Sequence, residues 1–227
     1  MTDPLLLISS MATRHVLTEL IAAYRTADGR TVNLKAMGGV PAAQTVREGA
    51  VLDVVILASR PMAELEAAGR LVPGSRRLFA RSPMALGLPA GDATPAPKTV
   101  DELKAILQRA GRIGFSTGPS GDHVKALWKE WGFDHDPSVV LMQAPAGIPV
   151  AQLIADGTVG AGIQQLSELL DQPGVRVVGP VPDEAQLVTD FVCGVAASST
   201  APEAAHAICQ WLAAPNHTAT LIRHGML

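Results

Sequence analysis

Short apolar runs alternate with segments of helical periodicity along most of this 227-residue chain. The first runs predict buried strands at residues 5–8, 31–36 and 53–57, and a helical segment follows each of them. A strand followed by a helix at this short interval is typical of an open, mostly parallel α/β sheet. The chain is therefore expected to have an α/β fold.

A second series of the same kind follows a proline- and glycine-rich stretch at 89–97. Long strands expected at 82–88 and 186–197 join the two series, which predicts two lobes. Lobe I is expected to comprise residues 1–81 and 187–227, and lobe II residues 82–186. We expect the two crossing strands to form a hinge and the ligand cleft to lie between the lobes. The further predicted elements are helices at 14–24, 61–68, 100–109, 121–131, 150–155, 202–213 and 215–224, and strands at 112–115, 139–142, 160–163 and 175–178.

Charge and composition exclude several classes of function. The net charge is −3 and basic residues form no run, which argues against nucleic acid as a partner. No apolar run is long enough to span a membrane, so no membrane insertion is expected. Cys193 and Cys209 lack the spacing of metal or redox motifs and stand in apolar sequence, which predicts buried thiols. No metal and no cofactor are expected.

The first residues predict a location. Residues 1–4 lead directly into the short apolar run at 5–8, without the basic start and the length of a secretory signal. The sequence as written therefore predicts a cytoplasmic protein. A periplasmic location is expected if a signal segment has been removed.

Small polar residues gather after several predicted strands. Ligands of open α/β sheets bind beyond the carboxyl ends of the strands, so these positions are the candidate ligand site. The candidate ligand-binding residues are Ser9, Ser10, Arg14, Gly38, Gly39, Ser116, Thr117, Gly118, Ser120, Gly121, Gln164 and Gln165.

The stretch 114–123 is central among them. A strand runs into a turn rich in serine, threonine and glycine, and a helix starts from that turn. The N–H groups of the first helical turn and the positive end of the helix dipole favour an anion there. The alternative is an ordinary capped loop with nothing bound.

Several of these motifs together resemble the type II bacterial solute-binding proteins, and specifically the molybdate-binding-protein-like group. The resemblance covers nearly the whole chain. It implies a two-lobe, periplasmic-binding-protein-like fold of type II. Its motifs are Ser9-Ser10, the glycine loop at 37–40, the segments 53–58, 82–89 and 178–182, and His224-Gly-Met226.

The chain also departs from the molybdate binders. Gly38 and Gly39 stand where those proteins carry a second serine-rich stretch, and Gln164 and Gln165 stand where they carry a tyrosine. Amide side chains both donate and accept hydrogen bonds, which suits carboxylates or hydroxy acids better than a tetrahedral oxyanion. The segments 114–121 and 164–169 are similar to a branch that includes aconitate isomerase.

An isomerase of that type would move a double bond by a 1,3-proton shift, which needs a base and anion seats. His123 is the first candidate base, because an imidazole near a helix N-terminus tends to stay neutral. His15 is the second, and the alternative for both is a surface histidine. Arg14 is expected either to pair with a carboxylate or to stay solvated. Asp122 and Glu168 are interpreted as residues that stabilise helix dipoles.

The sequence thus predicts a protein that closes around a small anion, with a di- or tricarboxylate as the favoured ligand. The alternative is an aconitate-isomerase-like enzyme that uses the same cleft, so whether the chain is an enzyme stays open. A less favoured alternative is a molybdate or oxyanion receptor of an ABC transporter, with the permease as partner only if an exported form exists.

Overall fold

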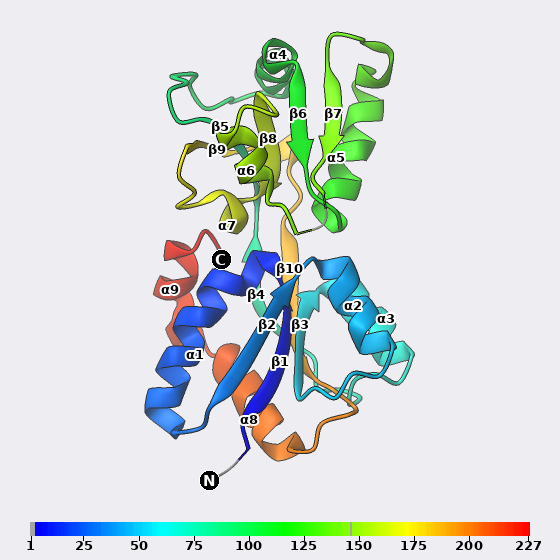
Figure 1. Cartoon of the computed structure of the whole chain (residues 1–227), viewed down its shortest axis with the longest axis vertical. Coiled ribbons are helices and arrows are strands. Elements are labelled where there is room, and N and C mark those ends of the chain that lie inside the picture. The colour runs from blue at the N-terminus through cyan, green and yellow to red at the C-terminus, as the bar shows by residue number, and fades with distance from the viewer. Residues whose placement is uncertain (1–2, 146) are drawn as a thin grey trace. The chain divides into compact units, whose positions relative to one another are not determined.

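The computed structural model describes residues 3–145 and 147–227. Met1 and Thr2, part of the start where no signal is expected, and Ala146 lie outside the described residues. Two compact units form, Met1–Ser82 with Thr189–Leu227 and Pro83–Val188. The chain passes from one unit to the other at 82–83 and again at 188–189 (Figure 1).

Within the described residues, the first unit holds a five-stranded sheet of order β2-β1-β3-β10-β4. Strands β1, β2 and β3 pair in parallel, whereas β10 pairs antiparallel with both β3 and β4. Four strands therefore run in one direction and β10 runs against them. The bounds are β1 Leu5–Ser10, β2 Val32–Met37, β3 Val54–Ala58, β4 Arg77–Ser82 and β10 Thr189–Val195.

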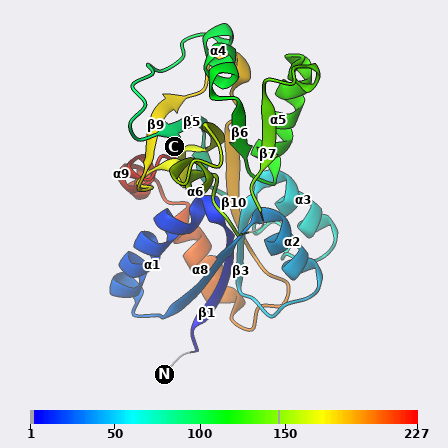
Figure 2. The same cartoon turned by 45° about the horizontal axis from the view of Figure 1, so that its top comes forward.

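Helices cover both faces of this sheet (Figure 2). Helices α1, α8 and α9 pack against one apolar core, and α2 and α3 against the other. The buried thiols Cys193 and Cys209 belong to the first core and form no disulfide, as predicted. The bounds are α1 Arg14–Asp28, α2 Gly39–Arg47, α3 Ser59–Ala67, α8 Pro202–Leu212 and α9 Thr218–Arg223, with the 3₁₀ turns η1 Met11–Thr13 and η4 Pro215–His217.

The second unit repeats this strand order. Its described strands form a five-stranded sheet of order β7-β6-β8-β5-β9, in which β6 pairs in parallel with β7 and β8, and β5 runs against its neighbours. The predicted mostly parallel sheet in each half is therefore confirmed. The bounds are β5 Met84–Pro89, β6 Arg112–Phe115, β7 Val140–Gln143, β8 Ala161–Gln165 and β9 Val175–Pro180.

Helices α4 and α5 cover one face of the second sheet, and α6 and α7 cover the other. Helix α4 starts where expected because the Thr99 side chain accepts a hydrogen bond from the Glu102 N–H at 3.2 Å. The bounds are α4 Val100–Ala110, α5 Pro119–Glu130, α6 Val150–Ala155 and α7 Leu166–Leu169, with the 3₁₀ turns η2 Phe133–His135 and η3 Asp183–Ala185.

Several predicted elements were wrong in extent. The strand expected at 82–88 is β5, and the separate strand β4 ends just before it at Ser82. Pro83 stands between them, and proline has no N–H with which to continue a ladder. The strand expected at 186–197 is the shorter β10, preceded by η3, and the helix expected at 215–224 divides into η4 and α9.

Asp53 ties the start of β3 to two other segments of the first unit. It is 5% exposed, and its Oδ2 accepts a hydrogen bond from the Leu6 N–H at 2.8 Å. Its Oδ1 accepts one from the Ser199 hydroxyl at 2.6 Å. One carboxylate thus satisfies a backbone donor in β1 and a hydroxyl far along the chain.

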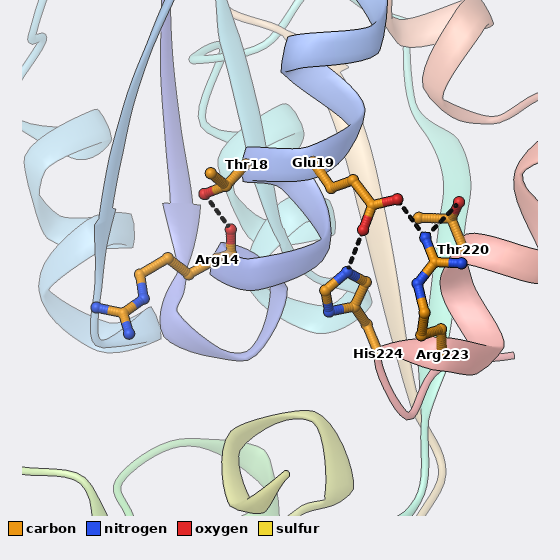
Figure 3. Close-up of polar contacts among 6 residues, drawn as sticks. All are labelled: Arg14, Thr18, Glu19, Thr220, Arg223 and His224. Atoms are coloured by element: carbon orange, nitrogen blue, oxygen red, sulfur yellow. Dashed lines mark hydrogen bonds and ion pairs between the residues drawn. The ribbon is translucent and has the colours of Figure 1, made fainter. Parts of the chain in front are cut away.

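The C-terminal residues also return to the first unit. His224 donates from Nε2 to Glu19 Oε2 at 2.8 Å, and Arg223 pairs with the same carboxylate (Figure 3). The hydrogen bond from His224 is the main reason why the pKa of Glu19 is lowered. Met226 is fully buried, and Leu227 exchanges two backbone hydrogen bonds with Arg81. These contacts hold α9 against α1.

Asp53→Ala is expected to lower the free energy of unfolding by about 2–3 kcal/mol, because two donors lose their charged acceptor. Asp190→Ala is the matched control, since Asp190 pairs with Arg81 at 2.9 Å on the surface. An exposed ion pair contributes about 0–1 kcal/mol. Urea unfolding measures both, and equal losses in the two variants would contradict the role given to Asp53.

Gly121→Ala is expected to destabilise the second unit by about 1–3 kcal/mol, because a Cβ atom on Gly121 would lie 1.7 Å from the Ser116 carbonyl oxygen. Gly39→Ala is the control, since its Cβ would come no closer than 3.9 Å to the side chain of Ser10. We expect Gly39→Ala to stay within about 0.5 kcal/mol of the wild type in urea unfolding. A wild-type midpoint for Gly121→Ala would show that the helix start can move away from Ser116.

Candidate functional site

Ser9 and Ser10 are the last two residues of β1, not part of the loop after it as expected. Ser10 pairs with Met37 in the register of β1 and β2, so Gly38 and Gly39 leave the sheet beside it. A Cβ atom on Gly39 would lie 3.9 Å from the Ser10 Cβ. The structure therefore brings together the two polar segments that the sequence placed after the first two strands.

Ser10 carries a hydroxyl whose hydrogen-bonding capacity is unused. The residue is 7% exposed, and among residues 3–145 and 147–227 its Oγ has no partner. The Ser10 carbonyl, in contrast, accepts from the hydroxyls of Ser9 at 3.2 Å and Thr13 at 3.1 Å. A buried hydroxyl without a partner is unfavourable, so this position suits a ligand atom or a bound water.

Helix α2 starts at Gly39, earlier than expected, with Gly38 as its N-cap. No side chain among the described residues caps it. The N–H groups of its first turn therefore depend on another acceptor. The start of α2 lies next to Ser10, so hydroxyl and backbone donors converge at one point of the first unit.

Arg14 and His15 open α1, and both are exposed. The Arg14 guanidinium lies 3.1 Å from His15 Nε2, which is therefore the acceptor of that contact. The Arg14 carbonyl accepts from the Thr18 hydroxyl, and its side chain extends away from Glu19 (Figure 3). Ligand binding by Arg14 and base catalysis by His15 stay predictions.

In the second unit, Ser116, Thr117 and Gly118 connect β6 to α5. Helix α5 begins at Pro119, so Ser120 and Gly121 lie in its first turn rather than in the loop expected there. Gly118 has a φ of +95°, which favours glycine. Ser120 is 5% exposed, whereas Thr117 is exposed.

Gln164 and Gln165 are the last residues of β8, which is a correction to the loop expected there. Phe115 pairs with Ile163, so Ser116 and Gln164 leave the pairing of β6 and β8 at the same edge. Both glutamines are buried, at 1% and 3% exposure. They point to opposite faces of the sheet because successive strand residues alternate.

Gln164 contacts Glu168, which lies in the first turn of α7. Its Nε2 donates to Glu168 Oε2 in α7 at 2.6 Å. Glu168 was interpreted as a helix-dipole residue, but it also fixes a buried amide at the edge of the sheet. The spacing of four residues could have indicated the pair, although it spans the junction of a strand and a helix.

His123 lies in α5, and its Nε2 is 3.1 Å from the carbonyl oxygen of Ala185. A carbonyl only accepts, so Nε2 carries the proton and Nδ1 is the ring atom that can accept one. Base catalysis by His123 stays a prediction, now restricted to Nδ1.

In the part of the chain that the structure describes, no group of three His, Cys, Asp or Glu side chains is placed to hold a metal ion. Across the same residues, no helix combines the length and the apolarity needed to cross a membrane.

Comparisons with known proteins give a consistent result. Residues 5–227 match the family model described as bacterial extracellular solute-binding protein. A curated relative, aconitate isomerase from Pseudomonas sp, is 30% identical over 215 residues, which span 92% of this chain and 82% of the relative.

Solved structures share the fold at low sequence identity. The periplasmic molybdate-binding protein of Azotobacter vinelandii matches with a TM-score of 0.78 and 17% identity, over 98% of both chains. The sulfate-binding protein SubI of Mycobacterium tuberculosis matches with a TM-score of 0.76 and 15% identity, over 99% of this chain and 86% of that one. These likenesses and the repeated strand order confirm the predicted type II periplasmic-binding-protein-like fold. The family match over residues 5–227 shows that the chain belongs to the bacterial extracellular solute-binding protein family.

Proposed function

We propose that this chain binds a small anion, a di- or tricarboxylate, with the polar groups at the carboxyl strand ends of its units. The observation that carries the proposal is the buried Ser10 hydroxyl, which has no partner among the described residues and lies beside the start of α2. A hydroxyl donor next to the positive end of a nine-residue helix favours a negatively charged ligand atom.

The second unit supplies groups of the same kind. No described side chain caps α5, which starts from Gly118 directly after Ser116 and Thr117. Ser120 adds a buried hydroxyl in its first turn. Nearly all these groups are neutral, so they stabilise an anion by hydrogen bonds rather than by ion pairs. The cleft expected between the lobes stays a prediction.

Two features favour a carboxylate over a tetrahedral oxyanion. Gln164, at the end of β8, has a buried carbonyl oxygen without a donor in the described chain. An organic acid can carry a donor group for such an acceptor, whereas deprotonated molybdate and sulfate carry none. Aconitate isomerase, the curated relative, is named for a tricarboxylate. The solved structures are named for molybdate and sulfate, which makes those oxyanions the competing ligands to test.

Ser10→Ala and Ser116→Ala are each expected to weaken citrate binding by about 1–3 kcal/mol, because each removes a donor to a charged ligand. Isothermal titration calorimetry measures the affinities, with molybdate and sulfate as parallel ligands.

Ser138→Ala is the control, because the Ser138 hydroxyl donates to Asp136 at the amino end of β7. We expect this variant to bind citrate like the wild type. Wild-type affinity in all three variants would show that the site has been misplaced, and binding of molybdate alone would overturn the carboxylate proposal.

The alternative function is an isomerase of the aconitate isomerase type, favoured by the 30% identity to that enzyme. In the 1,3-proton shift a base takes a proton from the methylene carbon of trans-aconitate. The electron pair of the broken C–H bond forms the new double bond, and the old vinyl carbon takes up a proton. Nδ1 of His123 is the candidate base, and the hydroxyl and N–H donors would stabilise the developing negative charge.

His123→Ala is expected to lower the rate of trans- to cis-aconitate conversion by about 10²–10⁴-fold, while trans-aconitate affinity stays within about threefold. Proton NMR in deuterated buffer follows the vinyl signal of cis-aconitate. His135→Ala, an exposed histidine away from the strand ends, is the control. Absence of conversion by the wild-type protein would exclude this alternative, and full activity in His123→Ala would exclude His123 as the base.

The predicted cytoplasmic location stays a prediction, and fractionation of cells that express the native gene checks it. The family description speaks of extracellular proteins. An ABC permease is a partner only for an exported form.

A further inference from the structure

The amide of Gln164 has a fixed orientation, and Glu168 sets it. Gln164 Nε2 lies 2.6 Å from Glu168 Oε2. An ionised carboxylate only accepts hydrogen bonds, so the NH₂ group must face Glu168. The reversed amide would place its carbonyl oxygen against the carboxylate, and the two oxygens would repel each other. The usual ambiguity of a glutamine amide is therefore resolved by chemistry at this position.

The carbonyl oxygen of the same amide consequently faces away from Glu168. Gln164 is 1% exposed, and over residues 3–145 and 147–227 its Oε1 receives no hydrogen bond. A buried carbonyl oxygen without a donor is unfavourable, so a donor from outside the chain is needed to complete this site. The oxygen belongs to the strand end that lies level with Ser116.

We propose that Gln164 selects a ligand that carries a hydroxyl group, so that the ligand class is hydroxy di- or tricarboxylates. This inference rests on the proposed carboxylate-binding function. A deprotonated carboxylate, like molybdate or sulfate, presents only acceptor oxygens and would repel Oε1. One N–H of the amide donates to Glu168, and the carbonyl oxygen is the acceptor that has no partner in the described chain.

A hydroxyl fits this position better than an ammonium group. In the same unit, the first-turn N–H groups of α5 are donors only, and the start of that helix favours negative charge. Donors of this kind do not stabilise a cation. A neutral hydroxyl is the donor that satisfies Oε1 without bringing a positive charge to the helix start.

The test compares ligands that differ only in the hydroxyl. Calorimetry measures the affinity of the wild-type protein for citrate against tricarballylate, and for each malate enantiomer against succinate. We expect citrate and one malate enantiomer to bind about tenfold more tightly than their partners, as one added hydrogen bond to a buried acceptor implies. Aspartate is the ammonium-bearing probe, and we expect it to bind no better than succinate.

Two variants test the assignment to Gln164. Gln164→Leu removes the acceptor, so citrate and tricarballylate should bind within about twofold of each other. Glu168→Gln frees the amide to turn and should reduce the same preference. Glu48→Gln is the control, because the exposed pair of Gln44 Nε2 and Glu48 Oε1 at 2.8 Å repeats the contact on α2. We expect Glu48→Gln to keep the wild-type preference.

The outcomes separate this inference from the proposed function. Equal binding of citrate and tricarballylate by the wild type would overturn the hydroxyl inference while leaving carboxylate binding intact. A preference that survives in Gln164→Leu, or aspartate binding more tightly than both malates, would overturn it too. Binding of none of these acids would overturn the proposed function itself. The wild-type comparison needs no variant to fold.

Discussion

Parallel pairing of neighbouring strands is the constraint on which the rest of each unit depends. The registers of β1 with β2 and of β6 with β8 bring the carboxyl ends of those strands to one edge of their sheet. Ser10 therefore lies next to Gly39. In the other sheet, Ser116 and Gln164 follow the last residue pair of β6 and β8. No single loop forms the candidate site, because its polar groups come from segments far apart in the sequence.

Each of these two sheet edges holds a buried polar atom that the described chain leaves without a partner. The Ser10 hydroxyl is a donor and the Gln164 carbonyl oxygen is an acceptor of this kind. Each such atom costs about 1–3 kcal/mol when unsatisfied, and a folded protein retains them where a ligand or a water supplies the missing hydrogen bond. The acceptor in the second unit is the atom that needs a donor from a ligand, which is the basis of the proposed preference for a hydroxyl group.

The sequence predicted the alternation of strands and helices, the fold and the family, because apolar runs of this length mark buried parallel strands. It missed β4, in which Arg77 and Arg81 interrupt the apolar pattern of a strand at the sheet edge. It predicted a loop at Gln164 and Gln165, because two amides that follow an apolar run look like the first residues after a strand. They are the last two residues of β8. The orientation of the Gln164 amide depends on the 2.6 Å contact with Glu168, which composition and periodicity cannot reveal.

The central claim is that polar groups at the strand ends bind the ligand. A titration of the ¹⁵N-labelled protein with citrate, followed by amide NMR signals, tests it most directly. We expect the signals of Ser10, Gly39 and residues 116–121 to shift together with one dissociation constant. Unchanged signals at these positions, with shifts elsewhere, such as at the surface groove of about 610 Å³ lined by Thr18, Arg25 and Val32, would contradict this claim.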